Sequence, residues 1–336
     1  MKMKKLAAAC LAAALSLSLA SCGGDTSWTH RSGEYTVTSG MYVGLSIDAL
    51  NAAAAVEGYD STKSPFDQDL EGSDGSKWVQ AKANSLAKEY LAVENEFANR
   101  GLTLSEEDQV AIDQQVEFYW TTFGMGTIYE EEGCNENSFT NLMTNTYKRS
   151  LLFESIYGEG GEKEVPETEL TDYFQENYAK GIYITLSLTD SEGNSLDLDE
   201  VKEDAQALAD RINNGEDFET VKAEYLADPA DESSSEPSDT SVVFLKESAT
   251  SQPYSGILET AQGEAAVIEA DSAVYVVTQL DPLSGDSLES YRSTILQALK
   301  GDEFEETVTD WVSALSIEEN SAAISKHNPN HLKDLF

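Results

Sequence analysis

The side chains best suited to acid–base chemistry are scarce in this sequence and lie near its ends. The three histidines are His30, His327 and His331, so no imidazole occurs between residues 31 and 326. A serine or cysteine nucleophile usually needs a histidine base, and most zinc sites use histidine or cysteine ligands. We therefore expect no Ser-His-Asp triad, no Cys-His pair, no His-rich zinc site and no cofactor in the body of the fold.

One acidic loop has only part of the spacing of a calcium site. Asp67 and Asp69 begin like an EF-hand loop, whose twelfth position must supply a bidentate glutamate. That position is Trp78. The loop therefore indicates an ordinary solvated turn, and we expect no metal site.

The cysteine with the most informative surroundings is Cys22. Three lysines precede an uncharged apolar run over residues 6–20, and the sequence then reaches Leu-Ala-Ser-Cys. A basic start and a short apolar run are typical of a secretory signal, and the last four residues resemble a bacterial lipobox. We expect residues 1–21 to be a lipoprotein signal peptide, Cys22 to be lipidated and residues 22–33 to form a flexible tether. The protein would then be extracytoplasmic and lipid-anchored to the bacterial cell membrane.

The charge of the chain excludes one class of partner. Its 336 residues include 21 Lys and Arg against 62 Asp and Glu, a formal net charge of −41. Nucleic acids bind proteins through clustered lysine and arginine, and the chain has no such cluster beyond its first five residues. We therefore expect no nucleic-acid binding. The oligomeric state stays open.

The spacing of apolar residues predicts a helical part, then a mixed part, then a helix again. The mixed part begins near residue 180 with a strand over 181–188, and we expect strands at 265–268 and 273–277 to pair. This order predicts an α+β fold, in which a helical domain made from both chain ends holds an inserted α/β domain. The expected domains are residues 34–178 plus 285–336, and residues 179–284. The expected helices cover residues 41–56, 77–100, 105–123, 137–157, 167–179, 199–213, 217–225 and 287–315.

Several passages occur in the order found in one known family. Residues 103–107 read Thr-Leu-Ser-Glu-Glu between two helices, and residues 215–218 read Gly-Glu-Asp-Phe. Pro253 and Tyr254 follow, and then Gly263 and Glu264. Together these passages resemble extracytoplasmic foldases of the PrsA/SurA type, which combine a helical chaperone region with a parvulin-type domain. The resemblance implies a site made of Tyr183, Asp228, Phe244, Tyr254 and Tyr275.

The sequence departs from this family where parvulins carry two active-site histidines, because Tyr183 and Tyr275 occupy those places. The resemblance implies a chaperone or foldase that binds unfolded, newly exported polypeptides, with weak or no turnover in the parvulin-like domain. One alternative is an active peptidyl-prolyl cis-trans isomerase, and a second is a solute-binding lipoprotein, which would need two lobes of alternating strands and helices. The aromatic stripe of Trp78, Tyr90 and Phe97 either belongs to the core or lines a groove for clients.

Overall fold

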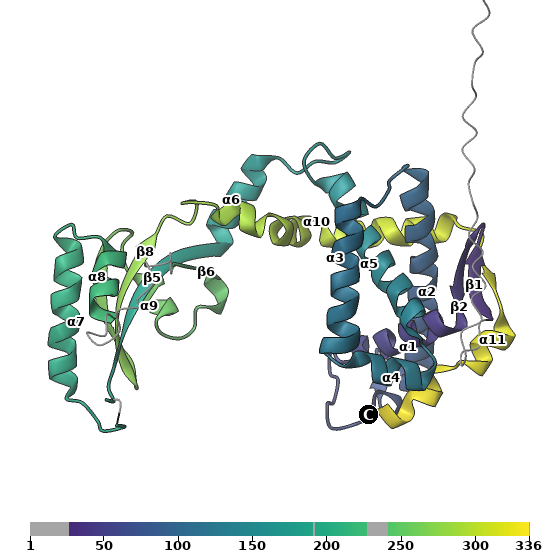
Figure 1. Cartoon of the computed structure of the whole chain (residues 1–336), viewed down its shortest axis with the longest axis horizontal. Coiled ribbons are helices and arrows are strands. Elements are labelled where there is room, and N and C mark those ends of the chain that lie inside the picture. Colours follow the sequence, from purple (N-terminus) through teal and green to yellow (C-terminus); the bar gives the residue numbers. More distant parts are fainter. Residues whose placement is uncertain (1–26, 191, 227–240, 336) are drawn as a thin grey trace, which may run out of the picture. The chain divides into compact units, whose positions relative to one another are not determined.

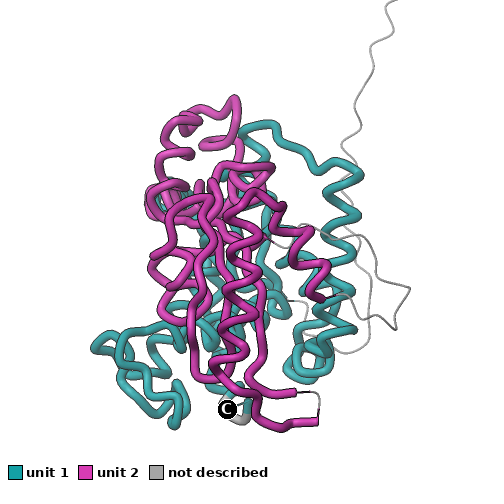
Figure 2. The backbone as a smooth tube through the Cα atoms, turned by 90° about the vertical axis from the view of Figure 1, so that its left-hand side faces the viewer, with its two compact units in different colours: residues 1–153, 305–336 teal, residues 154–304 magenta. Residues whose placement is uncertain are grey.

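The computed structural model describes residues 27–190, 192–226 and 241–335, and it has the α+β class that the sequence predicts (Figure 1). The chain divides into two compact units (Figure 2). Unit 1 comprises residues 1–153 and 305–336, and unit 2 comprises residues 154–304. Among the described residues, no helix is both long and apolar enough to cross a membrane.

Unit 1 is built from helices and two small sheets. One sheet consists of β2 (Tyr35–Thr38), β1 (Trp28–Ser32) and β9 (Glu318–Glu319) in that order, and in the other β3 (Asp69–Leu70) pairs with β4 (Ser73–Asp74). The described part of unit 1 is therefore not a lobe of alternating strands and helices, of which a solute-binding lipoprotein would need two. The helical elements that lie wholly or partly in unit 1 are α1 (Ser39–Ala53), η1 (Pro65–Asp67), α2 (Gly75–Asn99), α3 (Glu106–Glu117), η2 (Phe118–Thr122), α4 (Met125–Glu132), α5 (Glu136–Tyr157), α10 (Ser287–Ala314), α11 (Ser321–Lys326) and η4 (Pro329–Leu335).

The sheet of unit 1 corrects the tether expected over residues 22–33. Residues 28–32 form β1 (Trp28–Ser32), which pairs with β2 (Tyr35–Thr38) and with β9 (Glu318–Glu319). The strand escaped sequence reasoning because its buried positions carry polar side chains, among them Thr29 and His30. Residues from both ends of the chain thus share one sheet.

The core of unit 1 follows from the helical period. On α2, Val79, Ala83, Ala87 and Leu91 recur every four residues, so they lie on one face, and all four are fully buried. The C-terminal residues pack on the same body, where Arg149 pairs with Glu305 and the guanidinium of Arg100 lies 5.8 Å from the ring centre of Trp311. Residues 305–336 are thus part of this helical unit.

Unit 2 centres on an antiparallel sheet of β5 (Tyr178–Ser187), β6 (Val242–Leu245), β7 (Ala265–Glu269) and β8 (Ala273–Leu280), in the order β6-β5-β8-β7. The unit covers residues 154–304 and not the expected 179–284. Residues beyond both expected ends pack at the start of β5, where the ring centre of Tyr178 lies 5.0 Å from that of Phe174 and 5.1 Å from that of Tyr291. The helical elements wholly within the unit are α6 (Glu167–Asn177), α7 (Leu198–Asn213), α8 (Phe218–Leu226), η3 (Lys246–Ser248) and α9 (Tyr254–Glu259).

The two faces of this sheet differ in character. Side chains alternate between faces along a strand, so Ile182, Ile184 and Leu186 of β5 share one face, together with Val274 and Val276 of β8. These residues form a buried core with α7 and α8. The opposite face of the sheet is the one that carries the tyrosines expected to form the site.

Candidate functional site

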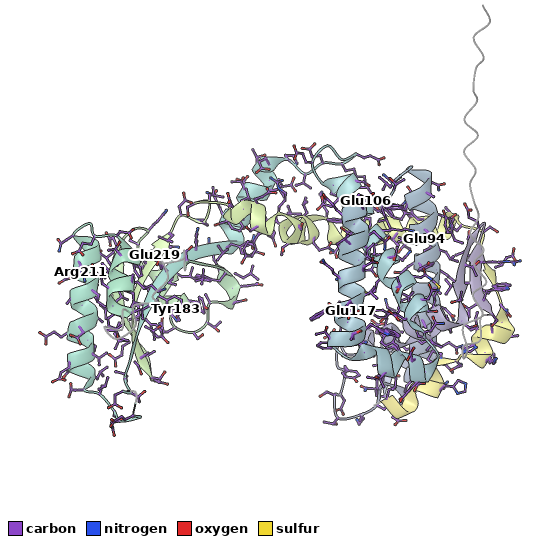
Figure 3. All side chains as sticks on the ribbon, in the orientation of Figure 1. Glu94, Glu106, Glu117, Tyr183, Arg211 and Glu219 are labelled. Atoms are coloured by element: carbon purple, nitrogen blue, oxygen red, sulfur yellow. The ribbon has the colours of Figure 1, made fainter. Side chains whose placement is uncertain are left out.

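Four of the five side chains predicted for the site come together on the face of the unit 2 sheet opposite α7 and α8. They form a chain of edge-to-face contacts, and Tyr183, labelled in Figure 3, lies in it between Tyr254 and Tyr275. All four side chains are half-buried. The ring-centre distances are 6.1 Å for Tyr183–Tyr275, 6.3 Å for Tyr183–Tyr254 and 5.0 Å for Phe244–Tyr254. We call these four residues the tyrosine cluster.

The register of the sheet positions three members of the cluster. Thr185 pairs with Tyr275 across β5 and β8, so Tyr183 and Tyr275 are diagonal neighbours on one face, close enough for aromatic side chains to meet. Phe244 on β6 lies directly opposite Ala179. Because Ala179 and Tyr183 are an even number of residues apart, Phe244 faces the same side of the sheet.

Helix α9 brings the fourth member, Tyr254, from its first turn. The helix is anchored by the fully buried Ile257, which packs over Gly181 of β5. A Cβ atom on Gly181 would lie only 2.5 Å from Cγ2 of Ile257. A glycine is therefore required here for the helix to approach the strand.

Three of the four members of the cluster, Tyr183, Tyr254 and Tyr275, carry a phenol hydroxyl that can donate a hydrogen bond. Burial, with the neighbouring hydroxyls of Tyr254 and Tyr275, raises the pKa of Tyr183 above its ordinary value of 10. The phenol therefore keeps its proton at neutral pH and can donate it in a hydrogen bond. Since no histidine occurs between residues 31 and 326, the cluster holds no imidazole that could act as an acid or base near pH 7.

One residue near the cluster was missed at the sequence level. Nζ of Lys222 on α8 lies 5.8 Å from the ring centre of Tyr183, within the range of a cation–π contact. The sequence feature that could have pointed to Lys222 is its position on the short helix that begins at Phe218, four residues earlier. Asp228 and Cys22, the other two predicted functional residues, lie outside the described part of the chain.

Two of the hollows formed by the described residues lie in unit 1. One, of about 270 Å³, lies between α1, α2 and α5, with Leu45, Leu86, Tyr90, Val93 and Leu142 on its apolar side and Asp48, Glu89, Asn145, Thr146 and Arg149 among its polar groups. Of the aromatic stripe expected on α2, Tyr90 lines this hollow, whereas Phe97 is buried in the core. Trp78 donates a 2.8 Å hydrogen bond from Nε1 to Glu71.

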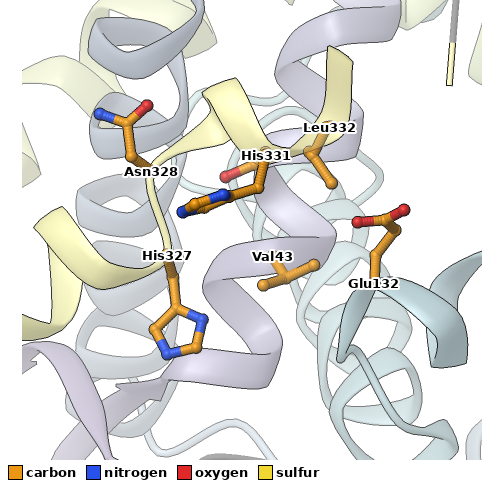
Figure 4. Close-up of a pocket in the computed structure, with 7 residues that line it drawn as sticks. Val43, Glu132, His327, Asn328, His331 and Leu332 are labelled. Carbon is orange, nitrogen blue, oxygen red and sulfur yellow. The ribbon is translucent and has the colours of Figure 1, made fainter. Parts of the chain in front are cut away.

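The second hollow, of about 210 Å³, gathers the two C-terminal histidines. Figure 4 shows His327 and His331 on one side of it and Glu132 on the other, with Val43 and Leu332 between them. Within the described residues, no group of three or more His, Cys, Asp or Glu side chains is placed to hold a metal ion.

Comparison with known proteins returns structures but no sequence match. No protein-family model matches the chain, and no curated protein matches it. Similar solved structures include foldase protein PrsA from Streptococcus pneumoniae str. Canada MDR_19A, with 12% identity, 70% of this chain and 83% of the other covered, and a TM-score of 0.35.

Two further similar structures cover nearly the whole chain. The foldase protein PrsA from Lactococcus lactis has 13% identity, with 90% of this chain and 97% of the other covered and a TM-score of 0.37. PrsA from Bacillus subtilis has 13% identity, with 93% and 94% covered and a TM-score of 0.27. These are foldases of the type that the sequence passages resemble.

Proposed function

We propose that this protein is a lipid-anchored extracytoplasmic chaperone or foldase, which binds unfolded exported polypeptides. Its tyrosine cluster binds proline-containing segments and accelerates their isomerisation weakly or not at all. The observation that carries the proposal is the tyrosine cluster itself, a set of four half-buried aromatic rings on one sheet face with no imidazole among them.

Aromatic surfaces suit proline for a physical reason. Proline-rich segments adopt an extended, preformed helix whose rings dock against aromatic side chains at little entropic cost. The phenol groups of Tyr183, Tyr254 and Tyr275 add donors for the carbonyl groups of such a segment. The cluster therefore has the parts needed to bind proline.

Catalysis of prolyl isomerisation requires more than binding of the proline. Rotation about a peptide C–N bond crosses a barrier of about 20 kcal/mol, and an enzyme must stabilise the twisted amide more than the planar one. A phenol whose pKa is raised, such as that of Tyr183, is a poor proton donor near neutral pH. We therefore expect binding to persist while catalysis is weak or lost.

The hollow between α1, α2 and α5 supports the chaperone role of unit 1. Its apolar lining can take up a single apolar side chain of an unfolded polypeptide. Glu89 already pairs with Arg149 of the same hollow at 3.9 Å, so Asp48 is the carboxylate that would favour a client with a basic residue next to that side chain.

The test uses a short peptide with one Phe-Pro bond and the same peptide with alanine in place of proline. Binding is measured by NMR titration, and cis–trans exchange of the Phe-Pro bond is measured in the same samples. We expect the proline peptide to bind more tightly, Tyr254→Ala to weaken it at least about tenfold, and exchange to stay near the rate of the free peptide. Tyr225→Ala, an exposed tyrosine on α8, is the matched control.

Each outcome of this test separates the alternatives. A marked acceleration of exchange that Tyr254→Ala abolishes would make the protein an active isomerase instead. Equal affinity for both peptides would remove the role of the tyrosine cluster. The lipid anchor is tested separately, because Cys22→Ala should release the protein from the membrane fraction and remove the lipid mass from its N-terminal peptide.

A further inference from the structure

Aromatic side chains are exposed just after α3, far in sequence from the tyrosine cluster. Phe118 is 50% exposed and Phe123 is 69% exposed, although both are large apolar residues. With Tyr119 they form a group of touching rings, with centres 5.3 Å apart for Phe118–Tyr119 and 6.3 Å apart for Phe118–Phe123 and Tyr119–Phe123. We call these three residues the aromatic patch. Exposed apolar patches on folded proteins commonly mark interaction sites.

A π-helical turn gathers the patch. In η2 the N–H of Phe123 donates a 2.7 Å hydrogen bond to the carbonyl of Phe118, five residues earlier. In a regular α-helix two such residues would point about 140° apart, at about 100° per residue. The π turn instead places one above the other, and such turns are frequent at functional sites.

Trp120 holds this turn in place by packing in the opposite direction. Its ring lies 5.3 Å from Phe139 and 6.4 Å from Tyr129, both in the core of unit 1. It also covers Gly126, where a Cβ atom would lie 2.8 Å from Cε2 of Trp120. The patch is therefore fixed on the outside of a well-packed turn.

The segment of the chain that carries the patch has ionisable side chains of a single sign. Residues 101–147 contain nine Asp and Glu and no Lys, Arg or His. Glu106 and Glu117, labelled in Figure 3, lie on α3 itself, and Glu130, Glu131 and Glu132 end α4. Within the described part of the chain, none of the nine carboxylates has an ion-pair partner. Their charge is thus open to a cationic partner.

We propose that the aromatic patch binds a segment of an unfolded polypeptide in which aromatic or aliphatic side chains alternate with lysine or arginine. The rings would take up the apolar side chains, and the surrounding carboxylates would pair with the basic ones. A second copy of this chain is a poor partner for the patch, because two copies that each carry a net charge of −41 repel each other. An anionic membrane is disfavoured for the same reason. That the segment belongs to a client rests on the chaperone role proposed above.

The experiment is a fluorescence-anisotropy titration of the full chain with three labelled, proline-free peptides of fifteen residues. One repeats Phe-Lys-Ser, one repeats Phe-Glu-Ser and one repeats Ser-Lys-Ser. Phe118→Ser/Phe123→Ser is the patch variant, and Leu226→Ser, which changes an apolar side chain that is 60% exposed on α8, is its control. Because the changed side chains are exposed, both variants should fold, which circular dichroism checks.

We expect Phe-Lys-Ser to bind at least about tenfold more tightly than either other peptide, and the patch variant to lose at least about tenfold in affinity while Leu226→Ser keeps it. Glu117→Gln/Glu130→Gln/Glu131→Gln should reduce the loss of affinity caused by added salt.

Equal binding of Phe-Glu-Ser, or unchanged binding by the patch variant, would overturn the proposal. So would patch-dependent dimerisation, or patch-dependent binding to phosphatidylcholine vesicles without peptide binding. If the peptides bind as expected but the protein does not suppress the aggregation of unfolded proteins, the result contradicts the chaperone function and still supports the aromatic patch as a peptide-binding surface.

Discussion

Replacing Gly181 by alanine should loosen α9 and with it the tyrosine cluster. The new methyl group would lie 2.5 Å from Cγ2 and 2.9 Å from Cδ1 of Ile257, and 3.1 Å from the carbonyl oxygen of Thr278. Contacts this short require α9 to move outward, which carries Tyr254 away from Tyr183 and Phe244.

The magnitude follows from two opposing effects. Overpacking of a buried position costs about 1–3 kcal/mol, and the reduced freedom of the unfolded chain offsets about 0.4–1 kcal/mol of this. We therefore expect unit 2 to lose roughly 1–2 kcal/mol of stability. Affinity for the proline peptide should fall together with stability.

The assay is hydrogen exchange of the β5 and β8 amides in the full chain at increasing urea. Trp28, Trp78, Trp120 and Trp311 all lie in unit 1. Their fluorescence therefore reports the stability of unit 1 as an internal control, and its midpoint should not change.

A double variant makes the reasoning refutable. Ile257→Ala alone should cost about 2–5 kcal/mol by leaving a cavity. The double variant Gly181→Ala/Ile257→Ala should lose at least about 1 kcal/mol less stability than the sum of the losses of the two single variants, because the added methyl group enters the vacated space. If Gly181→Ala is neutral, or the two effects simply add, the account of how α9 is positioned is wrong.

Three further predictions concern unit 1. Burial lowers the pKa of His30 to about 4, whereas a histidine in the unfolded chain has a pKa near 6.5, so between these pH values the unfolded chain binds a proton that the folded chain does not. The free energy of unfolding should therefore fall by roughly 3 kcal/mol as the pH drops from 6.5 to 4. Urea unfolding followed by tryptophan fluorescence should show a weaker dependence of this free energy on pH for His30→Leu. Burial raises the pKa of Cys134 to about 12, so alkylation of this thiol, followed by mass spectrometry, should be at least about 100-fold slower in the native protein than in urea; a fast native reaction would contradict its burial. Lys148→Met should cost about 2–4 kcal/mol, because Nζ lies 2.6 Å from the buried Glu94 carboxylate; recovery in Lys148→Met/Glu94→Leu is expected, and no recovery would place the cost elsewhere.

Much of the fold is predictable because burial in it follows simple periods. Alternation along residues 181–188 separates Tyr183 from the buried Ile182 and Ile184. On α2 the extent of the helix was predictable, but the stripe was only partly right: Phe97 is buried, whereas Trp78 and Tyr90 are partly exposed and the fully buried positions include Val79 and Leu91. β1 broke this rule, because its buried positions are polar. The π turn was also hidden, because residues 118–123 are rich enough in aromatic side chains to continue an amphipathic helix.

The sequence allowed us to predict which residues form the site, but not all the contacts that their side chains make. The resemblance named Tyr183, Phe244, Tyr254 and Tyr275, which the fold brings together. It gave no reason to include Lys222, whose contact with Tyr183 depends on how α8 packs against the sheet. Such contacts between elements leave no trace in local sequence periodicity.

The most direct test of the central claim is to locate a bound proline. A peptide with a photoreactive leucine beside its proline is irradiated with the full chain, and the crosslinked residues are identified by mass spectrometry. Crosslinks concentrated at Tyr183, Phe244, Tyr254 and Tyr275, and lost when the unlabelled proline peptide competes, are the predicted result. Crosslinks that avoid these four residues, or that persist under competition, would contradict the account.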